Sequence, residues 1–498
     1  MTDSTTSILW VRNDFRVGDN PALNEACERG HVLPVYIYVS ADAKWSPGGA
    51  TRVWLYHALR DFAGALERLN LPLIIRAGEE LQELLSVAKA VGATRVVWNR
   101  RYEPEGISVD TRVKAELNSL GIEARSFGAG LLGEPYRVFN KQGKPFKVFT
   151  AFYKHCLQNE TVRTPVPAPH TALAPKSLPT SVGLDALKLL PTVRWDQGVI
   201  RHWEVGELAA RKRLDSFEPQ VRGYDDARDR PASDGVSSLS PYLHFGHVSA
   251  AQVVATVRAG ASDAMFESAY SRKRVVATVR AGASDAEPFV RQVYWRDFAH
   301  YLLFHFPTLP DAPMNAQFEH FPWSDDADES VVAWQRGQTG YPLIDAGMRQ
   351  LWQTGWMHNR VRMNVASFLV KHLLTDWRVG AAWFWDTLFD ADLANNAMGW
   401  QWAAGCGVDA APYFRIFNPV LQGQRFDGAG AYIRHWVPEL AALPDADIHA
   451  PWAASPLVLQ AANVKLGQSY PEPVVDHSQA RAAAQAAYAE MKARASTA

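Results

Sequence analysis

Residues 356–363 combine side chains that could bind a planar, charged ligand. Trp356, Asn359, Arg360 and Met363 are spaced i, i+3, i+4 and i+7 in this stretch, and that spacing predicts that they share one face of a helix. A purely structural face would more often be Leu and Val. An indole, an amide, a guanidinium and a thioether instead supply stacking surfaces, hydrogen bonds and positive charge.

A second stretch repeats the arrangement with Gln292, Trp295, Arg296 and Ala299. Two such faces meeting could form a pocket that holds an extruded nucleic-acid base, because that task needs stacking, amide hydrogen bonds and positive charge.

Acidic side chains gather at Asp390 and Asp392, just before Asn395 and Asn396. Two carboxylates in this spacing can bind Mg²⁺. They can equally pair with an arginine or accept hydrogen bonds from a cofactor. Arg362 lies about 60° around its helix from Asn359 and is free to pair with one of these acids.

The stretch from Asp234 to Pro241 is rich in Gly and Ser and precedes an expected helix. Its N–H groups and hydroxyls could bind a phosphate, and an ordinary Ser N-cap explains it equally well. His244 and His247 are interpreted as packed or exposed side chains, since no third metal ligand lies nearby in the sequence. The motifs GxSxG, HExxH and the P-loop do not occur.

The elements that must position these residues change along the chain. Short β-branched runs at 8–11, 32–39, 71–75 and 94–98 alternate with helix-like segments at 52–69, 79–91 and 109–120. This alternation predicts a doubly wound parallel α/β sheet. No GxGxxG follows the first run, so the dinucleotide fingerprint is missing.

Apolar residues recur three and four apart from about residue 201 onward, which predicts an all-helical second half. We therefore expect four parts: an α/β domain at 1–135, an interdomain linker at 136–200, a helical domain at 201–475 and an Ala-rich tail at 476–498. The same twelve residues occur at 253–264 and 275–286. So exact a repeat indicates a recent duplication and predicts a surface insertion, whose removal would leave one continuous helix-like segment leading into Glu287.

Composition narrows the class of protein. The chain has 498 residues, a formal net charge of −1 and three cysteines without CxxC spacing. These values argue against a structural zinc site, a disulfide scaffold or an overall basic field. Without a signal peptide or a long apolar run, a soluble cytoplasmic protein is expected. Ten of the 18 Trp fall between Trp295 and Trp402, which indicates either a bulky core or indoles used for stacking or electron transfer.

Taken together, seven stretches resemble the photolyase/cryptochrome family over nearly the whole chain, from Ile8 to about Pro473. They are ILWVRNDFRVGDNPAL, DGVSSLSPYLHFG, YWRDF, TGYPLIDAGMRQL, TGWMHNRVRM, FDADLANNAMGWQW and PYFRIFNP. The class I or related class III cyclobutane pyrimidine dimer photolyases are most similar. The resemblance implies an N-terminal antenna domain and a C-terminal helical domain that holds FAD, active in its reduced anionic form.

The resemblance also implies roles for individual residues. Contacts to FAD would come from Tyr224, Val236, Ser237, Ser238, Leu239, Ser240, Arg362, Asp390, Ala391, Asp392 and Asn396, with Arg362 and Asp390 as an ion pair beside the flavin ring and Asn396 near its N5. The flipped dimer or the DNA backbone would contact Gln292, Trp295, Arg296, Asn359, Arg360, Met363, Trp402 and Gln422. Electrons would reach the flavin through Trp323, Trp377 and Trp400.

Three departures from the family pattern affect the expected function. Gln292 stands where dimer photolyases usually have Glu and is more typical of (6-4) photolyases, but Met363 stands where (6-4) enzymes need His. Val236 replaces a Thr and loses one hydroxyl contact to FAD. In the antenna region Glu105-Gly106 replaces a folate-type Asn-Glu pair, so methenyltetrahydrofolate, a deazaflavin and no antenna all stay open.

The expected function is light-driven splitting of cyclobutane pyrimidine dimers in single- and double-stranded DNA. The expected enzyme is a monomer without a membrane or an obligate protein partner. A cryptochrome-type photoreceptor and a (6-4) photolyase are the alternatives. Asn396 and the short C-terminal extension disfavour a plant-type cryptochrome.

Overall fold

The chain forms two compact units that interleave in sequence. A computed structural model describes residues 5–39, 45–268, 285–324, 328–409 and 415–497. The first unit consists of residues 1–222 and 237–307, and the second of residues 223–236 and 308–498. Residues 223–236, here called the strap, therefore leave the first unit to pack with the second, and the chain then returns.

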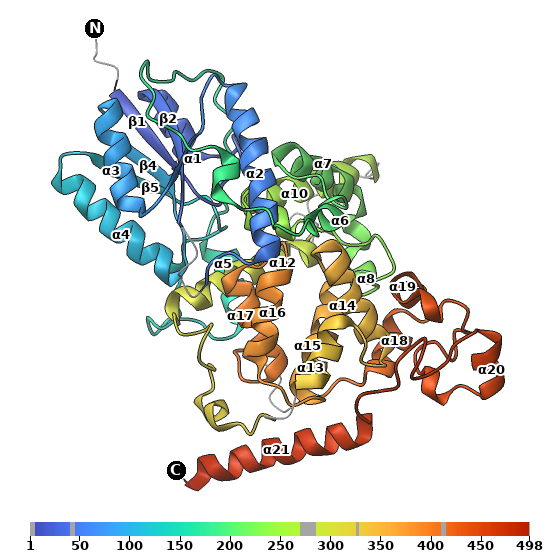
Figure 1. The fold of residues 1–498 in the computed structure, drawn as a ribbon. Helices are drawn as coiled ribbons and strands as arrows, with labels where there is room; N and C mark the ends of the chain where they lie inside the picture. The colour runs from blue at the N-terminus through green and yellow to red at the C-terminus, as the bar shows by residue number, and fades with distance from the viewer. Residues whose placement is uncertain (1–4, 40–44, 269–284, 325–327, 410–414, 498) are drawn as a thin grey trace. The chain divides into compact units, whose positions relative to one another are not determined.

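A five-stranded parallel sheet organises the first unit (Figure 1). Its order is β3-β2-β1-β4-β5, so the chain reverses direction across the sheet between β1 and β4, as in doubly wound folds. The strands are β1 (Thr5–Val11), β2 (Gly30–Tyr38), β3 (Ile74–Ala77), β4 (Arg95–Asn99) and β5 (Glu123–Phe127). The predicted α/β fold class is confirmed.

Strand prediction succeeded where the strands are buried on both faces. β4 is buried along its whole length, and β1 is buried from Ser7 to Val11. The expected third run at 71–75 begins too early, because only its last two residues belong to β3. β5 was missed: it is an edge strand of mixed exposure that begins with Glu123 and carries Arg125, so its sequence shows little apolar signal.

Ten α-helices accompany the sheet among the described residues of the first unit, and η marks 3-10 turns. They are α1 (Pro21–Glu28), α2 (Gly49–Glu67), α3 (Glu80–Val91), α4 (Pro104–Ser119), α5 (Phe149–Asn159), α6 (Asp196–Ile200), α7 (Glu207–Phe217), α9 (Ser240–His244), α10 (Ala250–Ser268) and α12 (Glu287–His305), with η1 (Pro135–Arg137), η2 (Leu184–Leu187) and η3 (Glu218–Gly223). One apolar core lies between α3, α4 and the sheet face that carries Trp10, Val35 and Val96.

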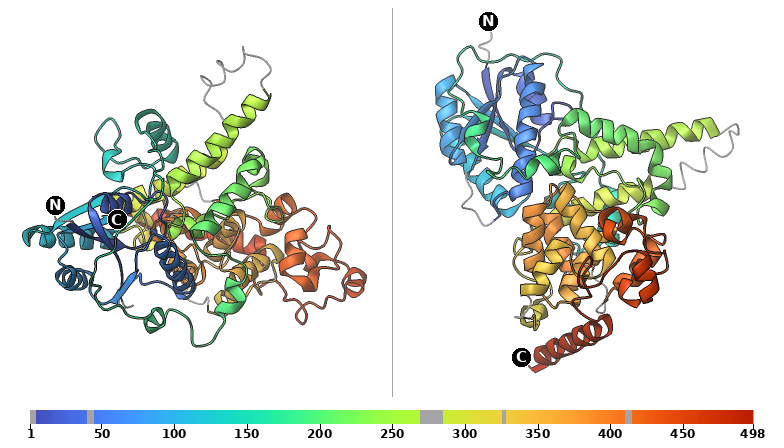
Figure 2. Two further views of the ribbon diagram at one scale, coloured as in Figure 1. Left: turned by 90° about the horizontal axis from the view of Figure 1, so that it is seen from above. Right: turned by 45° about the vertical axis from the view of Figure 1, so that its right-hand side comes forward.

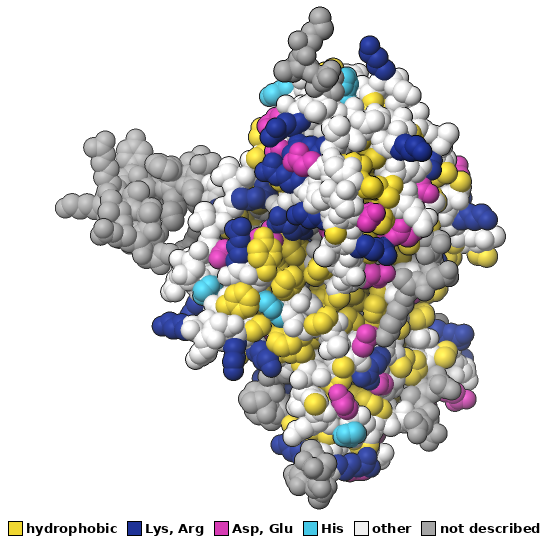
Figure 3. Space-filling model, turned by 90° about the vertical axis from the view of Figure 1, so that its left-hand side faces the viewer, with side chains coloured by type: hydrophobic (Ala, Val, Ile, Leu, Met, Phe, Trp, Pro, Cys, Tyr) yellow, Lys and Arg dark blue, Asp and Glu magenta, His cyan; other side chains and the backbone are white. Residues whose placement is uncertain are grey.

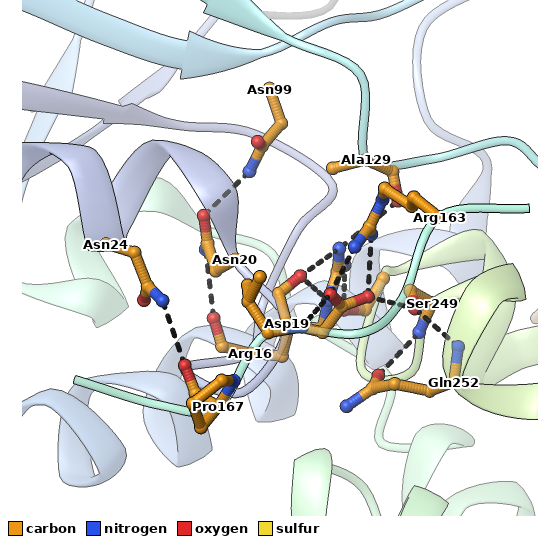
Figure 4. Close-up of polar contacts among 12 residues, drawn as sticks. Arg16, Asp19, Asn20, Asn24, Asn99, Ala129, Arg163, Pro167, Ser249 and Gln252 are labelled. Carbon is orange, nitrogen blue, oxygen red and sulfur yellow. Dashed lines mark hydrogen bonds and ion pairs between the residues drawn. The ribbon is translucent and has the colours of Figure 1, made fainter. Parts of the chain in front are cut away.

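A buried ion pair joins later segments to the loop between β1 and α1 (Figure 4). The Asp19 carboxylate, fully buried, accepts hydrogen bonds on Oδ1 from Arg163 and from the Val166 N–H (2.9 Å), and on Oδ2 from Arg163 Nη2 (2.6 Å) and Ser249 Oγ. Four donors thus satisfy one carboxylate. The guanidinium of buried Arg16 donates to the Asp19 carbonyl and to that of Gly246 (2.8 Å). These bonds tie residues 163–166 and 246–249 to the segment between β1 and α1.

The segment predicted as a linker, residues 136–200, contains α5 and α6. Phe149 at the start of α5 is fully buried and its ring stacks on Trp295 of α12, with centroids 3.7 Å apart. Residues 201–222 and 237–307, expected in the helical domain, also pack in the first unit. The bounds of the two compact units therefore differ from the predicted domain bounds. The predicted domains themselves stay a prediction.

Only the first copy of the duplicated sequence lies mostly within the described residues. The first copy lies in α10, where Val253, Val254 and Val257 are buried, and Figure 2 shows α10 as a straight, extended helix. Residues 275–284 of the second copy lie outside the described residues. An Arg258–Glu287 ion pair of 3.7 Å joins α10 to α12. This contact shows that α10 and α12 are two helices that pack against each other. The expectation of one continuous helix-like segment concerns a chain without the repeat, and it stays a prediction.

The second unit is helical in its described residues. Its helices are α8 (Tyr224–Ala227), α13 (Asp328–Arg336), α14 (Pro342–Thr354), α15 (Asn359–Lys371), α16 (Trp377–Thr387), α17 (Leu393–Ala404), α18 (Pro419–Phe426), α19 (Ala431–Trp436), α20 (Pro456–Ala461) and α21 (His477–Thr497), with η4 (Ala316–His320), η5 (Pro438–Leu440) and η6 (Pro451–Ala453). One core joins α14, α15, α16 and α17 and includes Phe368, Trp377 and Trp400. Among all described helices, none is both long and apolar enough to cross a membrane.

Candidate functional site

An ion pair between α15 and the loop before α17 lies at the centre of the predicted cofactor site. Arg362 Nη2 donates to Asp390 Oδ2 at 2.8 Å, and Arg362 Nε donates to the Met357 carbonyl at 2.7 Å. The Asp390 side chain is 4% exposed and that of Arg362 is 24% exposed. The sequence prediction that Arg362 pairs with one of the two acids is therefore confirmed.

Among the buried polar atoms without a hydrogen-bond partner in the described residues, one belongs to this pair and one to the predicted electron path. They are Asp390 Oδ1 and Trp400 Nε1. A buried acceptor left unsatisfied costs about 1–3 kcal/mol, so a group that donates to Asp390 Oδ1 would be stabilised there. An acceptor beside a guanidinium fits the N–H and carbonyl edge of a flavin ring, and these residues are therefore compatible with FAD.

The two acids of the Asp390–Asp392 pair have different roles. Asp392 is the N-cap of α17, where its Oδ1 accepts from Asn395 N at 2.8 Å and from Asn395 Nδ2 at 2.6 Å. Ala391 between them is buried. Asn396, one residue further along α17, donates from Nδ2 to the Ala381 carbonyl at 2.9 Å. The amide of Asn396 is thereby oriented by α16.

Three tryptophans of the predicted electron path pack with one core. Trp400 and Trp377 are buried, and Trp323 is partly buried against the same core. Gly380 of α16 permits the close approach of Trp400, because a Cβ at that position would lie 2.1 Å from the indole Cη2. Sequence spacing alone could not show this packing, since the three residues come from different segments.

The lesion-facing residues expected on α15 are only partly brought together. α15 begins at Asn359, with His358 as its N-cap, so Trp356 lies outside the helix and the prediction that it shares the helical face is wrong. Asn359 and Met363 do lie on one face, with Asn359 Nδ2 4.0 Å from Met363 Sδ. The His358 side chain caps the start of α15, because its Nδ1 accepts a hydrogen bond from the Arg360 N–H at 3.2 Å.

Arg360 is bound within the protein by groups that the sequence did not reveal. Its Nη2 and Nε lie 2.7 and 3.1 Å from Asp229 Oδ1 in the strap, and its guanidinium lies 4.4 Å from the Phe426 ring centroid. Asp229 and Phe426 were missed because neither lies in a periodic pattern. The one available signal was the run of charges around Asp229.

His358 is held neutral beside this ion pair. Burial lowers the pKa of His358 to about 4, although the nearby Asp229 carboxylate opposes the shift. Its Nε2 is buried without a hydrogen-bond partner among the described residues. Since Nδ1 accepts a hydrogen bond, the neutral ring carries its proton on Nε2.

The second predicted face lies on α12 in the first unit. Trp295 stacks on Phe149, with an interplanar angle of 9°, and Arg296 Nη1 donates to the Gly130 carbonyl at 2.8 Å. Gln292 is half-buried, and its amide makes only a long contact of 3.4 Å with the Pro288 carbonyl of its own helix. The amide of Gln292 thus remains available to a ligand.

The Ser-rich stretch does not form the side-chain N-cap that was one interpretation of it. α9 starts at Ser240, and its N-cap is Leu239, without a side-chain hydrogen bond. Ser238 has a φ of 50°, and the Ser237 carbonyl accepts from Arg213 Nε at 3.0 Å. Ser237 to Ser240 belong to the first unit, whereas Tyr224 and Val236 lie in the strap.

The neighbouring histidines match the packed interpretation. His247 is buried, and both of its ring nitrogens have a partner. Trp54 Nε1 donates to His247 Nε2 at 3.1 Å, and His247 Nδ1 lies 3.2 Å from the Phe15 carbonyl oxygen. Burial lowers the pKa of His247 to about 3.

The remaining DNA-facing candidates lie on α17 and α18. Trp402 is half-buried beside Lys371, whose Nζ donates to the Arg415 carbonyl. Burial lowers the pKa of Lys371 to about 7. Gln422 is half-buried on α18, a helix capped by Asn418.

The residues predicted to lie in the antenna region make contacts within the first unit. Glu105 lies in the first turn of α4, and Gly106 packs against Arg101, where a Cβ would meet the Arg101 Cβ at 2.9 Å. Arg52 donates to the Pro47 carbonyl at 2.9 Å.

Comparisons with known proteins cover nearly the whole chain. Residues 7–170 match the family model described as DNA photolyase, and residues 289–490 match the FAD binding domain of DNA photolyase. The chain is 44% identical to a deoxyribodipyrimidine photo-lyase of Agrobacterium fabrum, over 97% of this chain and 98% of that protein. It is 38% identical to cryptochrome-2 of Arabidopsis thaliana, over 95% of this chain and 77% of that protein.

The fold has a close match among solved structures. A bacterial class III photolyase from Agrobacterium tumefaciens superposes with a TM-score of 0.91 at 43% identity, covering 99% of this chain and 98% of the other.

Proposed function

The chain belongs to the photolyase and cryptochrome family, and from this premise we propose that it is a deoxyribodipyrimidine photo-lyase that splits cyclobutane pyrimidine dimers in light. The observation that carries the proposal is the end-to-end similarity to the Agrobacterium fabrum enzyme of that name. Within the site, the unsatisfied Asp390 Oδ1 beside Arg362 supports a bound flavin.

The side chains divide the work of binding and orientation. FAD, when bound and reduced, supplies one electron to the dimer under light and accepts it again after ring opening. Arg362 provides positive charge at the flavin site, and Asp390 holds the guanidinium in place. Asn359 and Met363 offer an amide and a thioether to the dimer on one helical face. No general acid is required, which agrees with the absence of the GxSxG and HExxH motifs from the sequence.

Trp400, Trp377 and Trp323 are proposed to carry electrons to oxidised flavin. Trp400→Phe should slow photoreduction of oxidised FAD by at least about tenfold, while chemically reduced enzyme continues to repair dimers. Photoreduction is followed by flavin absorbance under blue light. Loss of both activities would show that Trp400 is chiefly structural.

The proposed activity is tested on thymine dimers in single- and double-stranded oligonucleotides, with reduced enzyme, in blue light and in darkness. Light-dependent return of intact thymines is expected. No repair by enzyme that binds FAD would refute the dimer assignment. The same assay on a (6-4) oligonucleotide then tests the alternative that the amide at Gln292 favours.

A photoreceptor role is the second candidate, and the similarity to plant cryptochrome-2 favours it. A protein that binds and photoreduces FAD yet repairs neither lesion would support it. We further propose that the enzyme acts as a monomer in the cytoplasm, without an obligate protein partner. Light scattering at micromolar concentration tests the oligomeric state.

A further inference from the structure

One segment of the first unit carries strong positive charge although the whole chain has a net charge of −1. Between Glu134 and Glu160 there is no acidic residue, and five basic side chains are exposed: Arg137, Lys141, Lys144, Lys147 and Lys154. The flanking Glu134 is already paired with Arg100 at 2.8 Å. The positive charge of the segment is therefore not balanced within it.

A tight turn presents two of these lysines. Asn140 Oδ1 accepts from the Gln142 N–H at 2.9 Å and the Lys144 N–H at 3.0 Å, and the Asn140 N–H donates to the Lys144 carbonyl at 2.9 Å. Gly143 has a φ of 71°, which favours glycine. Because the turn is hydrogen-bonded to itself, Lys141 and Lys144 extend from an ordered backbone.

Exposed apolar side chains lie among the charges. Tyr136 is 42% exposed, Phe139 is 36% exposed and Val148 is 48% exposed. The Phe139 ring packs edge-on against His305, and Lys147 Nζ lies 5.2 Å from the Phe306 ring centroid. Figure 3 shows a face on which Lys and Arg side chains stand among hydrophobic ones. Basic side chains interleaved with aromatic ones are typical of nucleic-acid surfaces.

This segment is continuous with the helix that carries Gln292, Trp295 and Arg296. Phe149 stacks on Trp295 at 3.7 Å, and the guanidinium of Arg291 lies 5.3 Å from the Phe149 ring centroid. The Phe146 N–H donates to the Tyr301 hydroxyl at 2.9 Å, and that hydroxyl donates to the Val138 carbonyl at 3.0 Å. Residues 138–149 are thereby fixed to α12.

We propose that residues 136–154 form a second DNA-binding surface, which contacts the phosphate backbone outside the lesion pocket. The inference rests on the proposed function, because it takes DNA as the substrate. The surface contributes affinity that does not depend on the lesion, since phosphate contacts carry no sequence information. DNA fits better than an acidic protein because the charges are spread over a turn and a helix among stacking side chains.

The test is a triple variant, Lys141→Gln, Lys144→Gln and Lys147→Gln, with a matched control, Lys89→Gln, Lys114→Gln and Lys176→Gln. All six lysines are exposed in the first unit, and both variants change the net charge equally. Binding to a 30-base-pair duplex, with and without a thymine dimer, is measured in darkness at several salt concentrations.

The first variant should bind both duplexes at least about tenfold more weakly at low salt, and the slope of log affinity against log salt should fall by about three. The control should bind as the parent does. Unchanged affinity of the first variant, or an equal loss in the control, would overturn the proposal. Light-driven repair is measured separately at saturating protein, so absent repair in the parent would count against the proposed function alone.

Discussion

Two buried carboxylate–arginine pairs, one in each unit, show how differently the same chemistry can be used. Asp19 in the first unit receives four donors, from Arg163, Val166 and Ser249, so both of its oxygens are satisfied. Asp390 in the second unit receives Arg362 on Oδ2, while its buried Oδ1 has no partner among the described residues.

A carboxylate with both oxygens satisfied serves the fold, whereas a carboxylate with one unpartnered buried oxygen retains hydrogen-bonding capacity for a ligand. The contrast therefore separates a structural ion pair from one that belongs to a site, without reference to conservation. Single substitutions at these carboxylates test the separation.

Asp19→Asn should destabilise the protein most. The variant leaves the charge of Arg163 without a carboxylate partner at a buried position. Breaking such a pair lowers the free energy of unfolding by about 3 kcal/mol. The free energy of unfolding from urea titration measures the loss. FAD bound per folded protein should not change, and a specific loss of FAD would contradict the structural assignment of this pair.

The Asp19 pair should also make stability fall in acid. Burial raises the pKa of Asp19, but the hydrogen bonds from Arg163 and Ser249 outweigh it, so the pKa is lowered below 3.8. The stabilisation is therefore complete above about pH 4 and is lost as pH falls through the folded pKa. Unfolding free energies between pH 2 and 6 should show a shallower acid slope in Asp19→Asn than in the parent, and equal slopes would exclude this contribution.

Asp390→Asn should affect the cofactor more than the fold. Without the carboxylate, Arg362 loses its partner at the flavin site, and we expect FAD affinity to fall about tenfold, or about 1.4 kcal/mol. Fluorescence of released FAD on dilution measures it. The apoprotein melting temperature serves as the control. A large drop in melting temperature with unchanged FAD affinity would show that Asp390, like Asp19, has a structural role.

Asp229→Asn tests an intermediate case, because Asp229 uses one oxygen for Arg360 and is 32% exposed. A partly exposed pair contributes little, so we expect a loss of unfolding free energy of about 0.5–1 kcal/mol. Arg360→Lys should reproduce it, since Lys cannot place two nitrogens on one oxygen while stacking on Phe426. A double-mutant cycle measures the coupling, and independent effects would show that the pair is unimportant.

Deleting residues 265–286 should change almost nothing. The deletion joins Ala264 to Glu287 and recreates the present sequence at that junction. Residues 259–264, now the end of α10, would leave the helix and connect Arg258 with its neighbour Glu287. Both ion pairs lie elsewhere, so we expect stability within about 0.5 kcal/mol and unchanged FAD affinity. A loss of either would show that the duplicated segment has acquired a structural role.

Much of the scaffold followed from the sequence because its signals are local. Four strands and their connecting helices were expected near their observed positions, and the Arg362–Asp390 pair followed from helix geometry and the choice of nearby acids. The misses need long-range information. β5 is recognised by its pairing with β4, and Asp229 by a partner 131 residues away. Trp356 was misplaced because the His358 cap, which starts α15 later, depends on side-chain geometry.

The strap has a consequence for how the protein is made. Residues 223–236 leave the ribosome well before Arg360, and the 131 residues between Asp229 and Arg360 take roughly 7 to 26 s to synthesise. During that interval the strap has no completed unit to join. A fragment beginning at residue 308 would lack the strap altogether, so splitting the gene into two separately expressed halves should work best when the second unit is accompanied by the strap as a peptide.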